Sequence, residues 1–268
     1  MNQSVKLCTG LLLSALVFSS KSIATENLVF VHGAHFDARS WKPVSSYLSS
    51  DVNVLAVNLP GRNADEDASK IGLSNSAKSL CENIRSLEGN IHFAAHSQGG
   101  AVVHSAIGIC PSQSIKSITY ITSVAPLVGE SAFASLNADD EKHYFKGVSY
   151  NENNHRMEIR NWTHFNATFA QDASSSQTKQ LRKLAIDEPA HIGEEAVKYG
   201  KAELDRISKH YVFANQDKII SLESQLKIAN SLNIHSVYSL QTGHLPMLTN
   251  AKELAMILDG IVENVASD

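Results

Sequence analysis

Hydrophobic and polar positions follow two rhythms along this chain. Short runs of β-branched and apolar residues predict strands at 28–31, 52–59, 91–95, 118–124, 210–214 and 234–240. Between them, apolar residues recur at helical spacing and predict helices at 41–48, 74–87, 100–109, 221–232 and 251–265. Strands and helices that alternate in this way form a mostly parallel sheet with helices on both faces, so the sequence predicts an α/β fold.

The segment 126–209 breaks this alternation. It is more polar and contains the clusters 151–154 (Asn-Glu-Asn-Asn) and 174–176 (three serines). We interpret it as a mostly helical cap, inserted after the strand that ends near Val124. Its aromatic side chains could line a substrate pocket or, as is commoner, pack the cap onto the sheet domain. These residues are Phe133, Tyr144, Phe145, Trp162, Phe165 and Phe169, of which Phe133, Trp162, Phe165 and Phe169 are our candidates for substrate binding.

The first 24 residues resemble a secretory signal peptide. A polar stretch with Lys6 precedes an apolar run at 7–18, and small residues follow up to Ala24. A helix that spans a membrane needs about 20 apolar residues, so we favour a cleaved signal over an uncleaved anchor or a retained N-terminal helix. The expected product is an exported protein, periplasmic or secreted, with one domain of residues 25–268.

Charge and cysteine content narrow the possible roles. The net charge of the whole chain is −4, from 23 basic and 27 acidic residues. Loss of residues 1–24 removes two lysines and no acids, which gives 21 − 27 = −6. A mildly acidic protein is a poor candidate for binding nucleic acid. Cys81 and Cys110 would remain, and in an oxidising compartment they could form a disulfide or stay as buried thiols.

The segment Ala95-His96-Ser97-Gln98-Gly99-Gly100 joins a predicted strand to a predicted helix. A nucleophile elbow occupies this place, with a serine on a sharp turn and small residues two positions before and after it. Ala95 and Gly99 satisfy that requirement, so Ser97 is the candidate nucleophile. An ordinary glycine-rich turn would give the same short pattern.

A second segment, His32-Gly33-Ala34, follows the first predicted strand and should reach the same edge of the sheet. Acyl transfer passes through a tetrahedral oxyanion, which needs two fixed N–H donors. The backbone amides of Ala34 and Gln98 are the candidate pair. A tight turn after a strand would explain His32-Gly33 equally well.

Topology selects a base from the 12 histidines. Catalytic groups gather beyond the carboxyl ends of parallel strands. His244 follows the strand at 234–240, and Asp217 follows the strand at 210–214. The order Ser97, Asp217, His244 is the order of a nucleophile, acid and base on this fold. The alternatives are that Asp217 only caps a helix and that His244 is a structural loop histidine.

His92 and His96 are four residues apart on a predicted strand, which suggests a metal pair. At about 3.3 Å per residue they would be roughly 13 Å apart, too far to share one ion. We therefore expect structural roles for both, and neither a metal nor an organic cofactor.

Together these residues resemble the α/β-hydrolase superfamily, and within it the branch of small bacterial carboxylesterases, plant methyl-ester esterases and hydroxynitrile lyases. The motifs that carry the resemblance are His32-Gly33-Ala34 with Trp41, Leu59-Pro60-Gly61, Ala95 to Gly100, Gln216-Asp217 and Thr242-Gly243-His244. The resemblance implies the α/β-hydrolase fold and hydrolysis of a small-molecule carboxylic ester by a Ser97–His244–Asp217 triad.

The resemblance also implies which relatives fit poorly. Hydroxynitrile lyases of this branch carry threonine and lysine where this chain has Gly33 and Leu245, and dehalogenase relatives carry aspartate in place of Ser97. Both differences favour an esterase. A ligand receptor or binding protein that retains the triad but hydrolyses slowly stays open, as do a lactonase and an amidase.

Overall fold

A computed structural model describes residues 24–110 and 114–267 of the 268-residue chain. Apart from Ala24, the expected signal peptide lies outside the described residues. None of the helices in the described ranges has the length and apolar character needed to cross a membrane.

Six parallel strands form the central sheet in the order β2-β1-β3-β4-β8-β9. The strands are β1 (Glu26–Val31), β2 (Asn53–Ala56), β3 (Asn90–His96), β4 (Ser114–Ile121), β8 (Ser208–Ala214) and β9 (Ser236–Leu240). The inner strands β1, β3 and β8 are buried along nearly their whole length, because helices cover both faces of the sheet. The prediction of an α/β fold with a parallel sheet is confirmed.

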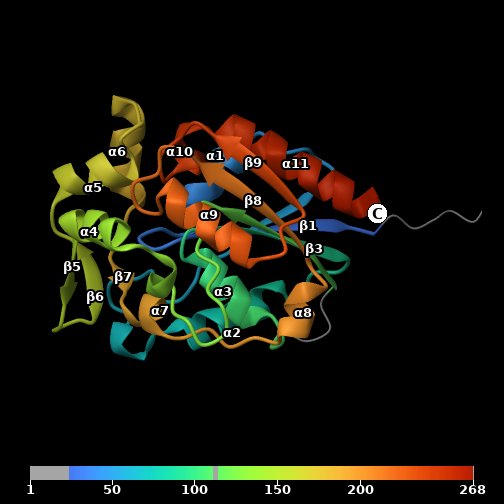
Figure 1. Ribbon diagram of the computed structural model, residues 1–268, viewed down its shortest axis with the longest axis horizontal. Coiled ribbons are helices and arrows are strands. Elements are labelled where there is room, and N and C mark those ends of the chain that lie inside the picture. The colour runs from blue at the N-terminus through green and yellow to red at the C-terminus, as the bar shows by residue number, and fades with distance from the viewer. Residues whose placement is uncertain (1–23, 111–113, 268) are drawn as a thin grey trace, which may run out of the picture.

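Helices pack on the two faces of the sheet in separate groups (Figure 1). On one face α1 (Lys42–Ser45), α10 (Pro246–Thr249) and α11 (Ala251–Ser267) contact each other. On the other face α2 (Leu73–Ile84) packs against α3 (Gly99–Ala106), and α9 (Leu222–Ser231) packs beside β8. Leu73, Ala77, Leu80 and Ile84 show why α2 forms: they recur every three or four residues and are all buried.

Most of the segment between β4 and β8 lies at one end of the sheet, and its last part runs back along the molecule to the other end (Figure 1). It contains helices and, contrary to the expectation of a mostly helical cap, a small antiparallel sheet in the order β5-β6-β7. Its elements are α4 (Ala138–Gly147), β5 (Val148–Asn151), β6 (Arg156–Ile159), α5 (Trp162–Phe169), α6 (Ser175–Leu184), β7 (Glu188–Pro189), α7 (His191–Glu194) and α8 (Lys201–Asp205). The Asn-rich cluster at 151–154 belongs to the hairpin between β5 and β6.

Several predicted boundaries differ from the observed ones. The helix expected at 41–48 is a 3-10 helix, Ala38–Trp41, followed by the single turn α1. Two further 3-10 helices lie at Ala68–Lys70 and Phe133–Ser135. The strand expected at 118–124 ends at Ile121, because Thr122 takes a positive φ of 34° and leaves the strand conformation. β8 begins at Ser208, inside the range that we assigned to the cap.

Strand register brings the candidate site residues to one edge. Val31 pairs with Ala95, His96 with Ile121, and Ala214 with Leu240, so these strands end close to the same level. The loops that follow them carry Ala34, Ser97, Asp217 and His244. The sheet therefore delivers four segments, far apart in sequence, to its carboxyl edge.

Candidate active site

Ser97 lies at the turn between β3 and α3 in a conformation that few side chains adopt. Its φ is 51°, in the left-handed region. The helix that follows approaches the end of β1 so closely that a Cβ at Gly99 would lie 2.7 Å from the carbonyl oxygen of Val31. The Ser97 carbonyl accepts hydrogen bonds from the Ser123 hydroxyl at 2.7 Å and from the Val124 N–H at 3.2 Å. These contacts hold the strained turn in place.

His244 connects Ser97 to Asp217. Its Nε2 lies 3.1 Å from the Ser97 Oγ, and its Nδ1 lies 2.7 Å from Oδ2 of Asp217. A carboxylate only accepts hydrogen bonds, so Nδ1 carries the proton and Nε2 presents a lone pair to the serine hydroxyl. The imidazole is buried. The backbone carbonyl of His244 accepts a hydrogen bond from Nε2 of His96 at 2.8 Å. This arrangement can remove a proton from Ser97.

The Asp217 carboxylate is buried but fully hydrogen-bonded. Oδ1 accepts from the backbone N–H groups of Ile219 at 2.7 Å and Ile220 at 3.1 Å. Oδ2 accepts from the Thr122 hydroxyl as well as from His244. Four donors replace the water that the carboxylate loses on burial, and they fix its orientation toward the imidazole. Asp217 therefore caps the following segment and orients His244 at the same time.

The two candidate oxyanion donors face the same cavity as Ser97. Ala34 and Gln98 both line it, and within the described residues neither N–H donates to a backbone carbonyl. A Cβ on Gly33 would lie 2.7 Å from Cβ of Ser97 and 2.8 Å from Nδ1 of His96. Only glycine at this position lets the loop after β1 come this close to Ser97.

A small cavity of about 40 Å³ lies beside Ser97. Its walls come from the loops after β1 and β3, the segment after β4, the cap and the loop after Asp217. No charged side chain is among the lining residues, which are Ala34, Ser97, Gln98, Val124, Ala132, Phe133, Leu136, Tyr144, Ile219 and Ile220. Such a pocket suits an uncharged, largely apolar group.

The four residues that we predicted to bind substrate lie in different parts of the structure. Phe133 lines the cavity. Phe169 lies outside the lining, but the edge of its ring packs against the His244 imidazole at 5.4 Å, and Phe165 stacks on Phe169 at 4.1 Å. Trp162 lies under the Arg182 guanidinium at 5.0 Å, away from the cavity. Three of the four therefore pack within the cap or onto the sheet domain, because their helix α5 turns its apolar face inward.

Tyr144 and Phe145 are neighbours on α4 with opposite surroundings. Tyr144 is buried and lines the cavity, whereas the Phe145 side chain is 48% exposed. The Tyr144 hydroxyl lies 2.8 Å from Nε2 of His35. Because the other ring nitrogen of His35 donates to the carbonyl of Ile186 at 3.0 Å, Nε2 accepts this bond from Tyr144.

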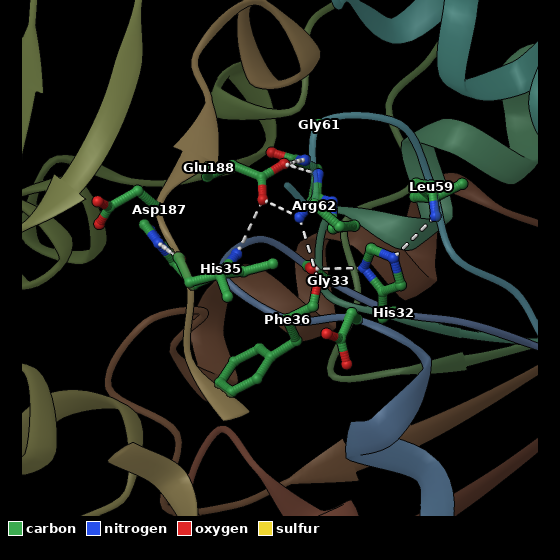
Figure 2. A network of polar contacts seen from close by, with 12 residues as sticks. His32, Gly33, His35, Phe36, Leu59, Gly61, Arg62, Asp187 and Glu188 are labelled. Atoms are coloured by element: carbon green, nitrogen blue, oxygen red, sulfur yellow. Dashed lines mark hydrogen bonds and ion pairs between the residues drawn. The ribbon is translucent and has the colours of Figure 1, made fainter. Parts of the chain in front are cut away.

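A buried ion pair between Arg62 and Glu188 was not anticipated from the sequence (Figure 2). Its carboxylate contacts the loops after β1 and β3. The two side chains meet through two contacts of 2.5 and 2.9 Å. Burial alone would raise the pKa of Glu188, but the Arg62 guanidinium beside it lowers that pKa to about 2. The carboxylate is thus charged throughout the range in which proteins are stable. Only the Leu59-Pro60-Gly61 motif, which precedes Arg62, marked this region in the sequence.

Burial lowers the pKa of the other histidines near the site. Burial, with a smaller contribution from Arg62, lowers the pKa of His32 to about 4. Its Nε2 accepts from the Leu59 N–H at 3.2 Å, and Nδ1 donates to the Gly33 carbonyl at 3.0 Å. His92 contacts Ser117 and Glu26, so it and His96 have separate partners.

Cys81 and Cys110 form a disulfide in the structure. Their Cα atoms are 5.0 Å apart, and the bond joins α2 to the segment that follows α3, the helix that begins beside Ser97. Of the two alternatives for this pair, the structure has the bonded one.

The family model described as "Alpha/beta hydrolase family" matches residues 28–257. Solved structures with a similar fold include a pyrethroid hydrolase from Sphingobium faniae JZ-2, which is 16% identical with a TM-score of 0.77, over 91% of this chain and 100% of that one. An extracellular alpha/beta-hydrolase from a Paenibacillus species is 22% identical with a TM-score of 0.73, over 87% and 97%. A methylesterase from Arabidopsis is 14% identical with a TM-score of 0.76, over 90% and 100%. No curated protein matches the sequence.

Proposed function

Because this chain belongs to the alpha/beta hydrolase family, we propose that it is a serine hydrolase of the carboxylesterase type that cleaves a small ester through an acyl-enzyme. One observation carries the proposal: the Ser97 hydroxyl, the His244 imidazole and the Asp217 carboxylate stand in one hydrogen-bonded line, with contacts of 3.1 and 2.7 Å. The serine at the start of this line faces a cavity.

Acylation would begin when Nε2 of His244 takes the proton of Ser97 and Oγ attacks the ester carbonyl. The N–H groups of Ala34 and Gln98 would hold the oxyanion that forms on the former carbonyl oxygen. His244 would then give its proton to the departing alkoxide, and the alcohol leaves. Asp217 would stabilise the imidazolium and keep its Nδ1–H directed away from the serine.

Deacylation would repeat these steps with water. Nε2 of His244 takes a proton from a water molecule, and the hydroxide attacks the acyl carbon of Ser97. The same two N–H groups hold the second oxyanion. The carboxylic acid and free Ser97 are the products, so the enzyme returns to its starting state.

The cavity supports an uncharged substrate of modest size. Its lining has no charged side chain, so a carboxylate or ammonium group there would lose its hydration without gaining a partner. The apolar lining residues include Phe133, Leu136, Ile219 and Ile220. Solved relatives named as a pyrethroid hydrolase and a methylesterase are consistent with ester chemistry on this fold.

Gly33 and Leu245 argue against cyanohydrin cleavage. The lyases that the sequence resembles carry threonine and lysine at these positions. Here a Cβ at residue 33 would overlap Ser97, and the buried Leu245 offers no charge for a departing cyanide. An ester is therefore the better substrate for this site.

We also propose that the protein is exported after removal of residues 1–24. The sequence pattern of these residues is the support, together with a similar fold in an extracellular Paenibacillus hydrolase. Mass spectrometry of the protein recovered from its native compartment would find Thr25 at the N-terminus. An intact Met1 or retained leader in the exported fraction would contradict this cleavage.

A panel of p-nitrophenyl and alkyl esters with increasing acyl length tests the activity. We expect multiple turnover above about 1 per second on at least one small ester, the low end of ordinary enzyme rates. Ser97→Ala should lose several orders of magnitude in kcat, whereas Ser231→Ala, on the outer surface of α9, should not. A single turnover that stops at bound product would favour a ligand-binding protein instead. Equal activity in Ser97→Ala would refute the proposal.

A further inference from the structure

Glu188 is a cap residue whose carboxylate contacts His35 and Arg62 (Figure 2). It also contacts the side chain of Gln98, the residue after Ser97. Its Oε2 accepts from the backbone N–H of His35 at 2.9 Å and from Arg62 at 2.5 Å. Its Oε1 accepts from Nε2 of Gln98 at 2.8 Å and from Arg62 at 2.9 Å. The side chain is almost fully buried. One carboxylate thus contacts two loops that belong to different strands.

These two loops are the ones that carry the proposed oxyanion donors. His35 directly follows Ala34, so the bond from Glu188 to the His35 N–H holds the peptide group next to the one that carries the Ala34 N–H. Gln98 supplies the other donor through its own backbone, and its side chain is held by Glu188. The distance between two donors decides how well they fit an oxyanion, and an error of 1 Å is costly. Glu188 is the group that spans both.

The cap reinforces this link with main-chain contacts. The Ile186 N–H donates to the His35 carbonyl at 2.9 Å, and the His35 ring donates back to the Ile186 carbonyl. On the other side of the ion pair, Gly61 takes a φ of 87°, and a Cβ there would lie 2.3 Å from Cγ of Pro189. The loop that carries Arg62 therefore packs directly on β7, beside Glu188.

The charge of Glu188 explains why Arg62 accompanies it. A buried negative charge close to a forming oxyanion would raise the energy of the transition state. Arg62 meets the carboxylate with two contacts and is itself buried, so the pair is neutral as a unit. Arg62 also donates to the Phe36 carbonyl at 3.0 Å, which gives the loop after β1 a second contact with the ion pair.

We propose that Glu188 is a positioning residue for the oxyanion hole, supplied by the cap, and that Arg62 cancels its charge. The inference rests on the proposed function, because it needs an oxyanion to form. It makes docking of β7 against the sheet domain part of active-site assembly. Neither side chain needs to touch the substrate.

Gln98→Met tests the link with the smallest disturbance, because it removes the amide contact to Glu188 and keeps the backbone N–H of residue 98. Positioned donors act on the transition state, so kcat should fall about tenfold with little change in KM. The affinity for a trifluoromethyl ketone, whose carbonyl carbon Ser97 attacks to give a tetrahedral oxyanion adduct, should fall by the same factor. A merely structural contact would lower stability and leave both values unchanged.

Arg62→Met tests the charge. It leaves Glu188 without its counter-ion, and we expect a larger loss of kcat than in the double variant Arg62→Met with Glu188→Gln, in which no buried charge is left. If Arg62 acted only in packing, adding Glu188→Gln to Arg62→Met would not restore any of the lost kcat. Glu26→Gln is the matched control, since it removes the carboxylate charge beside the buried His92 at the far end of β1. This control should keep the wild-type kcat.

The outcomes separate this inference from the proposed function. If the wild-type protein neither turns over esters nor forms a trifluoromethyl ketone adduct, the proposed function fails and this inference falls with it. If the wild type does both, but Gln98→Met keeps its kcat and adduct affinity and the double variant is no better than Arg62→Met, the positioning role of Glu188 is wrong and the proposed function stands.

Discussion

The Thr122 hydroxyl donates a hydrogen bond to Oδ2 of Asp217, the same oxygen that accepts from Nδ1–H of His244. Thr122 follows β4, and 95 residues separate it from Asp217. It adopts a positive φ of 34°, which is rare for a β-branched residue. Its backbone N–H bonds to the Val212 carbonyl at 2.9 Å, which helps to hold that conformation. The carboxylate is therefore oriented by the neighbouring strand end as well as by its own loop.

Thr122→Val should lower kcat about tenfold, because a hydrogen bond to a charged group contributes about 1.5–3 kcal/mol and valine keeps the shape of threonine. Steady-state kinetics on the best ester of the panel provide the measurement. Thr122→Ser retains the hydroxyl and should restore most of the rate. Equal rates for the valine and wild-type proteins would show that the Asp217 orientation does not depend on Thr122.

Asp217→Asn should be more severe. The asparagine amide can donate a hydrogen bond to Nδ1 of His244, which favours the tautomer that carries the proton on Nε2. In that tautomer the nitrogen that faces Ser97 cannot accept the serine proton. In Ser-His-Asp enzymes this change costs about 10⁴ in kcat. A loss of less than tenfold, with the fold intact by circular dichroism, would remove Asp217 from the mechanism.

Gly33→Ala should damage the site because the new Cβ would lie 2.7 Å from Cβ of Ser97. Something must shift, so we expect a drop in kcat/KM of at least tenfold and a lower melting temperature. Gly260→Ala is the matched control: it lies in α11 with no atom within 4 Å of the new Cβ. Alanine there should raise the free energy of unfolding by up to about 1 kcal/mol. Normal activity in Gly33→Ala would mean that the loop after β1 is free to move away from Ser97.

The Cys81–Cys110 bond closes a loop across a sequence separation of 29 residues. Loop-closure entropy predicts a stabilisation of about 3–4 kcal/mol for a loop of this length. Urea unfolding with and without dithiothreitol should show this difference, and the double variant Cys81→Ala with Cys110→Ala should not respond to the reductant. Unfolding midpoints that are equal in both conditions would argue against a stabilising bond.

Acid should destabilise the protein through its buried neutral histidines. Burial lowers the pKa of His104 from 6.5 to about 4, and the ring bonds to the Pro126 carbonyl at 3.0 Å and the Tyr120 hydroxyl at 2.7 Å. Between these two pH values the unfolded chain binds a proton that the folded chain does not. The contribution of His104 to stability is therefore complete above pH 6.5 and is lost as the pH falls toward 4.

His104→Gln tests this dependence. The variant will be less stable at neutral pH. Between pH 6.5 and 4 its free energy of unfolding should fall less steeply than that of the wild type, and the two slopes should differ by about 1.4 kcal/mol per pH unit. His164→Gln, at an exposed histidine of α5, should keep the wild-type slope. Parallel curves for His104→Gln and the wild type would contradict the burial of a neutral imidazole.

Much of the sheet was predictable because its signal is local. Buried parallel strands such as β1 contain short apolar runs, here Leu28 to Val31, and α2 shows its helical period directly. The arrangement of Ser97, Asp217 and His244 follows from one topological rule, that functional groups stand beyond the carboxyl ends of parallel strands. The structure brings these three side chains together as that rule requires, and their catalytic roles remain the proposal to be tested.

The cap was less predictable because its chemistry depends on contacts between distant segments. Arg62 and Glu188 are 126 residues apart, and nothing in the local sequence of either marks a partner. Likewise, periodicity cannot say which aromatic residues of a cap face the cavity. Phe133, in the 3-10 helix at 133–135, lines the cavity. Trp162 and Phe165 lie on α5, which packs against α4, and they are not part of the lining.

Covalent labelling of Ser97 tests the central claim most directly. The Ser97 oxygen should attack the phosphorus of a fluorophosphonate and displace fluoride, while His244 takes the serine proton. Peptide mass spectrometry should then find the phosphonyl group on Ser97 alone. Ester turnover should fall in proportion to the labelled fraction. Ser231→Ala should label as the wild type does, and Ser97→Ala should not label. A label on another residue that abolishes turnover, or full turnover in a protein labelled at Ser97, would contradict the account.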